Sequence, residues 1–256
     1  MTQNPSEADK PVYGGHANSD LTSRHLKSLK IASILERRTD LSQADVLDIG
    51  AGAGQTANFL KPRVRSVTAT DRETDAFLPT DIPILETPGT DLPFDASSFD
   101  IVVFNHVIEH VGERDDQRRI LSEIARILRP DGLLYLAVPN RWTLVEPHYR
   151  LAFLSWLPPS LASRYVRWRG KNDWYDCRPF AHRELLKTLQ SAGFETDDAT
   201  EEAFRDLLKI EKPDSRLARL LARLPSWLVR AAVPLMPTFV VICRARDQSH
   251  RRDATD

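Results

Sequence analysis

The stretch VLDIGAGAGQTANFL, residues 46–60, joins a short apolar run to a helix-forming segment through three closely spaced glycines. Glycines let the backbone turn sharply and approach a ligand closely, and the start of a helix offers free N–H groups. Further along, the run VTATD ends at Asp71, where a carboxylate can accept both hydroxyls of a ribose. These features predict a site for a nucleotide-like cofactor, with a tight turn that binds no ligand as the plainer alternative.

Two classes of cofactor fit this loop. Read from Gly52, the residues G-A-G-Q-T-A satisfy the G-x-G-x-x-A pattern of dinucleotide-binding turns. Read from Asp48, the residues D-I-G-A-G-A-G place an acidic residue before G-x-G-x-G. Asp71 suits both registers, so the loop alone leaves open a nicotinamide cofactor and another adenosine-containing cofactor.

Short apolar runs alternate with helical patterns along most of the chain, which predicts a mostly parallel sheet with helices on both faces. Within 115–128, for example, isoleucines and leucines recur at helical spacing, and Pro130 and Gly132 end the pattern. The expected strands are 46–49, 64–70, 82–85, 101–104, 133–138, a strand that begins at residue 194, and 239–245. The expected helices are 21–38, 56–60, 115–128 and 182–191.

The composition bounds the location and the partners. The 35 basic and 36 acidic residues nearly cancel, so no overall field favours nucleic acid. Two cysteines without metal-ligand spacing suit a reducing compartment, and the polar first residues show no secretory signal. We therefore expect a cytoplasmic protein, with the inner membrane surface as an alternative location. One domain is expected over 20–246, between a flexible arm, 1–19, and a disordered tail, 247–256.

Two later segments distinguish the two registers: TDLPFDASSFDIVVFNHVIEHV (90–111) and EIARILRPDGLLYLAVPN (123–140). With the loop that begins at Asp48, they resemble the class I S-adenosylmethionine (SAM) dependent methyltransferases, and within them the methyltransferase type 11 subgroup that contains the ubiquinone/menaquinone-type enzymes. The resemblance covers about 44–140 and extends weakly to 180–196. It implies an α/β Rossmann-like three-layer sandwich, with a seven-stranded, mostly parallel sheet of order 3-2-1-4-5-7-6 and an antiparallel strand 7.

The resemblance also implies SAM as the cofactor and a set of residues that would hold it. Asp48 would orient the loop or meet the methionine amino group through water, and Asp71 would accept the ribose hydroxyls. The family's usual acid before LPF is replaced here by Pro88, so Asp91 or the backbone of 89–92 would contact the adenine. The implied cofactor residues are Asp48, Gly50, Ala51, Gly52, Gly54, Asp71, Arg72, Asp91, Leu92, Asn105 and His106.

Methyl transfer from a sulfonium is a direct displacement, so the enzyme mainly positions the reacting atoms, and a hydroxyl acceptor also needs a general base. The candidate catalytic residues are His106, His148 and Tyr149. His106, Glu109 and His110 would share one face if they lay on a helix. Some ubiquinone-pathway and small-RNA methyltransferases carry a similar Glu-x-x-Glu-His metal motif. We expect no metal here, with Glu109 and His110 as the alternative ligands and local hydrogen bonding as the plainer interpretation.

Two insertions, about 141–180 and 204–236, leave the carboxyl edge of the expected sheet, where open α/β sheets bind ligands. We expect both to form a cap over the acceptor. Within 216–230, leucines and Trp227 form one apolar face beside several arginines. This pattern fits peripheral membrane contact or a helix packed on its own domain. The basic side chains of the insertions also suit an anionic acceptor.

We therefore expect a SAM-dependent O-methyltransferase of a small molecule, with a glycan or a lipid-linked intermediate as candidate acceptors. A nicotinamide-dependent oxidoreductase is the first alternative, but it predicts a hydride-transfer partner such as a Tyr-x-x-x-Lys pair, which the sequence lacks. An RNA or protein methyltransferase of the same fold is the second, and for RNA it predicts a basic face. A non-catalytic SAM-fold binding protein is the third, and it predicts damage to the glycine loop or Asp71, which are both intact.

Overall fold

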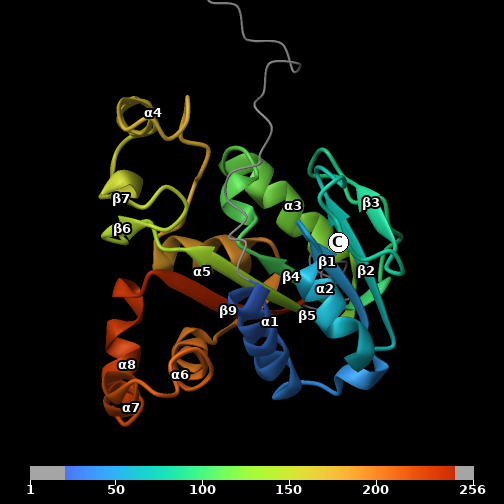
Figure 1. Cartoon of the computed structure of the whole chain (residues 1–256). Helices are drawn as coiled ribbons and strands as arrows, with labels where there is room; N and C mark the ends of the chain where they lie inside the picture. The colour runs from blue at the N-terminus through green and yellow to red at the C-terminus, as the bar shows by residue number, and fades with distance from the viewer. Residues whose placement is uncertain (1–20, 246–256) are drawn as a thin grey trace, which may run out of the picture.

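The computed structural model describes residues 21–245, so the predicted arm, 1–19, and tail, 247–256, lie outside the described residues. Seven strands form one sheet in the order β3-β2-β1-β4-β5-β9-β8 (Figure 1). All neighbours pair in parallel except β9, which is antiparallel to both β5 and β8. The strands are β1 Asp45–Ile49, β2 Ser66–Asp71, β3 Ile84–Glu86, β4 Phe99–Asn105, β5 Leu128–Pro139, β8 Phe194–Asp198 and β9 Thr238–Ala245. Since β9 is the seventh of these strands, the predicted order and the antiparallel last strand are confirmed.

Helices cover both faces of the sheet, because its central strands are apolar on both sides. On one face, α3 (Arg114–Ile127) and α5 (His182–Ser191) bury their apolar stripes against Phe104 and Leu136. On the other face, α1 (Leu21–Glu36) and α2 (Gln55–Leu60) pack on alternate residues of the same strands. The α/β three-layer sandwich expected from the sequence is therefore confirmed, and its loops after β1, β2, β3 and β4 meet at one edge.

The connection after β4 is a short turn before the predicted helix begins. Residues 108–110 form a single 3-10 turn, and His106 adopts a positive φ of 57°. The α-helix begins at Arg114, where the Asp116 carboxylate accepts a hydrogen bond from the Glu113 amide in a capping box. His106, Glu109 and His110 therefore do not lie along one α-helical face, although a tight turn still brings their side chains together.

The first insertion folds into a small substructure within the chain. It contains the hairpin of β6 (Val145–Glu146) and β7 (Leu151–Ala152), a 3-10 turn at Leu154–Trp156 and α4 (Pro159–Trp168). A small core of its own holds these elements together, and its buried members are Tyr149, Leu151, Leu154, Ala162, Val166, Tyr175 and Cys177. In Figure 1 this substructure lies beside α3 and α5, near the carboxyl end of β5.

The second insertion is helical and packs at the side of the sheet that carries α1. The helix α6 (Thr200–Ile210) packs beside α1, and α7 (Arg216–Leu221) and α8 (Ser226–Ala232) follow as a helical pair. The Arg205 guanidinium donates to the carbonyls of Ala222 and Leu224 at 2.9 and 3.0 Å, which fixes the turn between α7 and α8 onto α6. The apolar face expected over 216–230 is therefore divided at Pro225, which cannot continue the helix of the preceding residues.

Candidate functional site

A cavity of about 650 Å³ opens at the carboxyl edge of the parallel strands, a size within the range of small-molecule sites. One wall comes from the loop after β1, a second from the residues after β2 and β3, and a third from the turn after β4. The lining residues are Ile49, Gly50, Gly52, Asp71, Arg72, Glu73, Ala76, Thr87, Pro88, Gly89, Thr90, Leu92, Phe104, His106, Val107, His110, Val111, Gly112, Asp116, Ile120 and His148. His148 is the contribution of the first insertion to this lining, and the second insertion contributes none of these residues. That 204–236 covers the acceptor therefore stays a prediction without support from the lining of this cavity.

At one end of the cavity, backbone groups fix the carboxylate of Asp71. The Gly52 amide donates to Asp71 Oδ2 at 2.7 Å, and the Glu73 amide donates to Oδ1 at 3.2 Å. The Thr87 amide donates to the Asp71 carbonyl at 2.8 Å, which ties the end of β3 to the end of β2. The carboxylate therefore faces the cavity with its orientation already set, as an acceptor for paired hydroxyls must be.

The three glycines of the loop have different roles. Gly52 has a φ of 54°, and a Cβ added there would meet no atom within 4 Å, so its backbone borders open space in the cavity. A Cβ on Gly54 would lie 2.6 Å from Phe77 and 2.6 Å from Pro79, so this glycine permits the packing of the segment after β2. Gly54 was predicted to contact the cofactor, but it does not line the cavity.

Asp48 lies behind the loop, in β1, with a nearly inaccessible side chain. Burial raises its pKa to about 7, the nearby charge of Asp71 acts in the same direction, and a hydrogen bond from the Ala57 amide opposes them. Its Oδ2 has no hydrogen-bond partner among the described residues. A buried carboxyl of this kind favours a cationic ligand nearby, because a positive charge would offset the cost of its ionisation.

Three histidines surround one buried carboxylate at the other end of the cavity. Glu109 Oε1 lies 3.4 Å from His106 Nδ1 and 3.3 Å from His148 Nε2, and the Glu109 side chain is inaccessible to solvent. Burial raises the pKa of Glu109, but the interactions with these histidines outweigh it and lower the pKa to about 2. Burial lowers the pKa of His148, but the interaction of its ring with the Glu109 carboxylate and the other acidic groups around it raise the pKa overall. Glu109 is therefore an anion that orients two rings at the cavity wall.

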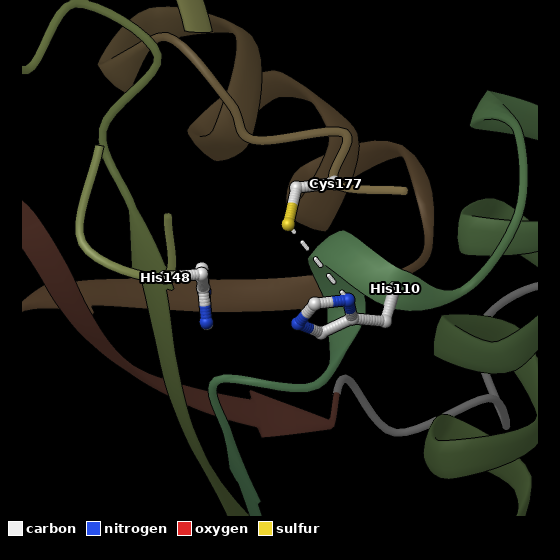
Figure 2. A group of neighbouring side chains, drawn as sticks. All are labelled: His110, His148 and Cys177. Carbon is white, nitrogen blue, oxygen red and sulfur yellow. Dashed lines mark hydrogen bonds between the residues drawn. The ribbon is translucent and has the colours of Figure 1, made fainter. Parts of the chain in front are cut away.

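Figure 2 shows a neighbouring group, in which the side chains of His110, His148 and Cys177 lie close together. The Cys177 sulfur lies 3.8 Å from His110 Nδ1, and the same nitrogen lies 3.2 Å from Asp176 Oδ2. Burial raises the pKa of the Cys177 thiol well above its usual value, which disfavours the thiolate.

Two overlapping sets have the composition of a metal site: His106, Glu109 and His148, and His110, His148 and Cys177. Ligands bound at about 2.0–2.1 Å around a tetrahedral ion lie roughly 3.4 Å apart. The two distances from Glu109 match that spacing. These two spacings are therefore compatible with ligands of a shared ion as well as with an ion-paired cluster.

The other predicted site residues divide into two groups. Arg72 and Leu92 line the cavity, whereas Asp48, Ala51, Asp91 and Asn105 do not appear among its lining residues. Tyr149, a predicted catalytic residue, is buried in the core of the insertion, and its hydroxyl donates to Asp176 Oδ1 at 2.6 Å. Burial and then Asp176 raise the pKa of Tyr149 far above its ordinary value. Tyr149 therefore holds the insertion together and does not face the cavity.

Several lining residues were missed by sequence reasoning. Thr87 follows β3 directly, and its place after a strand end is the signal that could have found it; Gly89 and Thr90 belong to the segment 89–92 that was predicted to contact the adenine. Glu73 follows Asp71 by two residues and carries the same positional signal. The apolar residues Val107, Val111 and Ile120 carry no such signal, because their pattern is that of ordinary core residues.

The comparisons with known proteins agree with this geometry. A methyltransferase domain model matches residues 47–136, which span the loop, Asp71 and the turn after β4. The matched segment therefore carries a methyltransferase domain, similar to those of SAM-dependent methyltransferases. SAM is therefore the methyl donor of the family to which the cavity belongs, and the nicotinamide alternative is overturned.

Named relatives support the same family. A probable SAM-dependent methyltransferase of Mycobacterium tuberculosis is 36% identical over 104 residues, which cover 39% of this chain and 37% of that protein. The matched residues thus make up well under half of the length of that relative. A ubiquinone biosynthesis O-methyltransferase of Methylocella silvestris is 27% identical over 208 residues, covering 73% of this chain and 72% of that protein.

Solved structures share the fold. A SAM-dependent methyltransferase from Archaeoglobus fulgidus superposes with a TM-score of 0.55 at 17% identity, covering 87% of this chain and 94% of that chain. Among residues 21–245 of this methyltransferase, no helix has the length and apolar character needed to cross a membrane.

The described residues fit SAM in three respects. The backbone at Gly52 leaves space where a side chain would intrude, Asp71 presents a fixed pair of acceptors, and Asp48 supplies a buried carboxyl suited to a nearby cation. Asp48, Gly52 and Asp71 all lie within residues 47–136, the segment that the methyltransferase domain model matches.

Proposed function

We propose that this protein transfers the methyl group of SAM to an oxygen atom of a small molecule that enters beside His106 and His148. One observation carries the proposal: Asp71, after β2, and the histidines of the turn after β4 and of the β6–β7 hairpin line the same cavity. One end therefore suits the nucleoside of the cofactor, and the other suits the acceptor.

SAM supplies an electrophilic methyl group and a good leaving group when it is bound. The residues of this chain then have two tasks, which are to hold the cofactor and to orient the acceptor. Asp71 would accept the ribose hydroxyls, and the backbone at Gly50 and Gly52 would lie beneath the methionine. Asp48 would favour binding through its charge, from behind the loop.

The histidine end can remove a proton from a hydroxyl. Glu109 lies near His106 Nδ1, which leaves Nε2 of the same ring to accept the proton of the acceptor. A buried carboxylate beside an imidazole fixes the orientation of the ring and stabilises the imidazolium that forms. We therefore assign His106 as the general base and Glu109 as its positioning residue. His148 shares the carboxylate and forms part of the acceptor wall.

The basic first insertion favours an anionic acceptor, such as a phosphate-bearing sugar or a lipid-linked intermediate. Arg141 lies at its start and Arg150 follows the loop that carries His148. Methylation of RNA or of a protein by the same fold remains the second candidate class.

Two measurements test the proposal. Isothermal titration with S-adenosylhomocysteine should give binding, whereas titration with NAD should give none; the reverse would refute the cofactor assignment. The protein is then incubated with methyl-labelled SAM and a cell lysate that is fractionated by solvent extraction, nuclease and protease. Label in a solvent-extractable or small-molecule fraction supports the proposal, and label that nuclease or protease releases would assign the acceptor to RNA or to protein.

A further inference from the structure

Positive charge in this chain is concentrated in two segments. The chain as a whole has a formal net charge of −1. Yet the segments 141–171 and 212–236 together hold eleven basic and two acidic residues, and one of those acids, Glu146, is buried. The basic residues are Arg141, Arg150, Arg164, Arg167, Arg169, Lys171, Lys212, Arg216, Arg219, Arg223 and Arg230. The surface of these segments is therefore cationic, while the rest of the chain carries the excess of acid.

The β6–β7 hairpin and the residues beside it expose a contiguous apolar patch, which we call the hairpin patch. Its members are Trp142, Leu144, Val145, Phe153 and Trp156. The rings of Trp142 and Phe153 lie 5.7 and 5.1 Å from the ring of Trp156, although Trp142 and Phe153 are 47% and 50% exposed. The Trp156 Nε1 donates to the Thr143 carbonyl at 2.9 Å, which fixes the patch to its own backbone. Large apolar side chains that gather on a surface in this way mark an interaction site.

The α7–α8 pair exposes a second set of apolar side chains, the helical patch, made of Leu217, Leu220, Trp227, Leu228 and Leu235. Trp227 is 71% exposed and Leu235 is 79% exposed. The buried Asn140, just before the hairpin segment, donates its amide to the carbonyls of Pro234 and Met236 at 2.9 and 2.8 Å, which ties the start of one segment to the end of the other. Figure 1 shows the hairpin and α8 on the same side of the molecule.

We propose that the hairpin patch and the helical patch together dock on the surface of an anionic lipid bilayer. Tryptophan, phenylalanine and leucine insert at the boundary between headgroups and acyl chains. Arginines beside them extend their charged ends to lipid phosphates, and each contributes to attraction by an anionic leaflet. Charge complementarity favours this partner over a neutral surface, because the exposed acids of the chain lie mostly outside the two segments.

Docking would place the cavity at the membrane surface. His148 lies between β6 and β7 and lines the cavity, so the hairpin whose exposed residues form the patch also supplies part of the acceptor wall. A lipid-borne acceptor could then reach the cavity from the bilayer. This consequence rests on the proposed methyl transfer, whereas docking itself does not.

Vesicle flotation tests the docking. The full chain is mixed with vesicles of phosphatidylcholine alone or with added phosphatidylglycerol, at low and high salt. We expect flotation with the anionic vesicles at low salt and a loss of several-fold at high salt, because salt screens exposed charges. Protein that stays in the bottom fraction with anionic vesicles at low salt would overturn the proposal.

Matched variants locate the surface. Trp142→Ser with Trp156→Ser, and separately Arg216→Glu with Arg219→Glu, should each reduce flotation several-fold. Trp168→Ser, which changes an exposed tryptophan of α4, and Arg183→Glu with Lys187→Glu, on the exposed side of α5, should leave it unchanged. Equal flotation of all four variants would refute the assignment.

Two further readouts separate the outcomes. Binding of S-adenosylhomocysteine should be unchanged in every variant. This result would show that each variant is folded and that cofactor binding does not depend on the docking surface. Light scattering should show the same mass with and without the tryptophan substitutions. A mass that falls on substitution would show that a second copy of the chain covers the patches, and would overturn docking on lipid.

Discussion

The amide of Gly52 donates a hydrogen bond of 2.7 Å to Oδ2 of Asp71, and this contact joins the loop after β1 to the end of β2. Replacing Asp71 with Asn weakens this charge-assisted contact and removes the charge that faces the cavity. Hydrogen bonds to charged groups contribute about 1.5–3 kcal/mol, so we expect the affinity for S-adenosylhomocysteine to fall about 10- to 100-fold in isothermal titration. Asp75→Asn, an exposed change nearby, is the control. Equal affinities for both variants would contradict the assigned role of Asp71.

Asp48 makes the stability of the free protein depend on pH. Its folded pKa of about 7 lies above the ordinary value of 3.8, so the folded state binds the proton more tightly. Its contribution to stability is therefore lost as pH rises from about 4 to about 7. We expect Asp48→Asn to raise the free energy of unfolding at pH 8 by about 1–4 kcal/mol, and by much less at pH 5. Denaturant melts at the two pH values measure this difference.

The same substitution should weaken the cofactor site. Asn at position 48 keeps the shape of the side chain but not its charge, so binding of SAM should fall while the fold gains stability at high pH. A variant that is less stable than the parent by the same amount at both pH values would contradict the buried-charge account.

Much of this fold could be predicted from the sequence, because strand ends, glycines and helical spacing are local signals. The place of Asp71 at a strand end followed from such signals, and the order of the sheet followed from the family resemblance. Tyr149 could not be assigned in this way. Its burial depends on Asp176 and on the small core of the insertion, which joins residues far apart in the sequence.

The contact of Glu109 with His148 shows the same limit. The two residues are neighbours because the hairpin of the first insertion folds back toward the turn after β4. The spacing of His106, Glu109 and His110 suggested a helix face, but the turn places them by a different geometry. The packing of α7 and α8 on α6 also depends on one distant side chain, Arg205, and no periodicity in the segment shows it.

Replacing Glu109 with Gln should impair methyl transfer and leave the cofactor bound. Without the carboxylate, His106 loses the group that orients it, and a general base contributes about 10²–10⁴-fold to a rate. We expect kcat to fall about 10²-fold or more, with little change in affinity for S-adenosylhomocysteine. Because Glu109 raises the pKa of His148, that pKa should fall in the variant, as followed by NMR titration. Glu113→Gln, exposed in the same connection, is the control.

Chelation distinguishes a base from a metal at this cluster. Since the Glu109 carboxylate already has His106 and His148 as partners, we expect methyl transfer to persist after dialysis against EDTA. Activity that is lost in EDTA and restored by Zn²⁺ or Mn²⁺ would instead assign His106, Glu109 and His148 as metal ligands. His110→Gln, outside that set, should then leave the restored activity in place.

Two alanine substitutions in the glycine loop should differ in effect: Gly54→Ala should mainly lower stability, and Gly52→Ala should mainly lower cofactor affinity. Gly54→Ala introduces a Cβ 2.6 Å from Phe77 and Pro79 at a φ of 79°. Overpacking and a left-handed backbone together should lower the free energy of unfolding by about 2–5 kcal/mol. Gly52→Ala meets no atom within 4 Å, so only the backbone cost of about 1–2 kcal/mol is expected. Its methyl group would enter the cavity, however, so binding of S-adenosylhomocysteine should fall at least tenfold. Thermal melts and isothermal titration on both variants measure the two effects, and a Gly52→Ala variant with unchanged affinity would place the cofactor away from this loop.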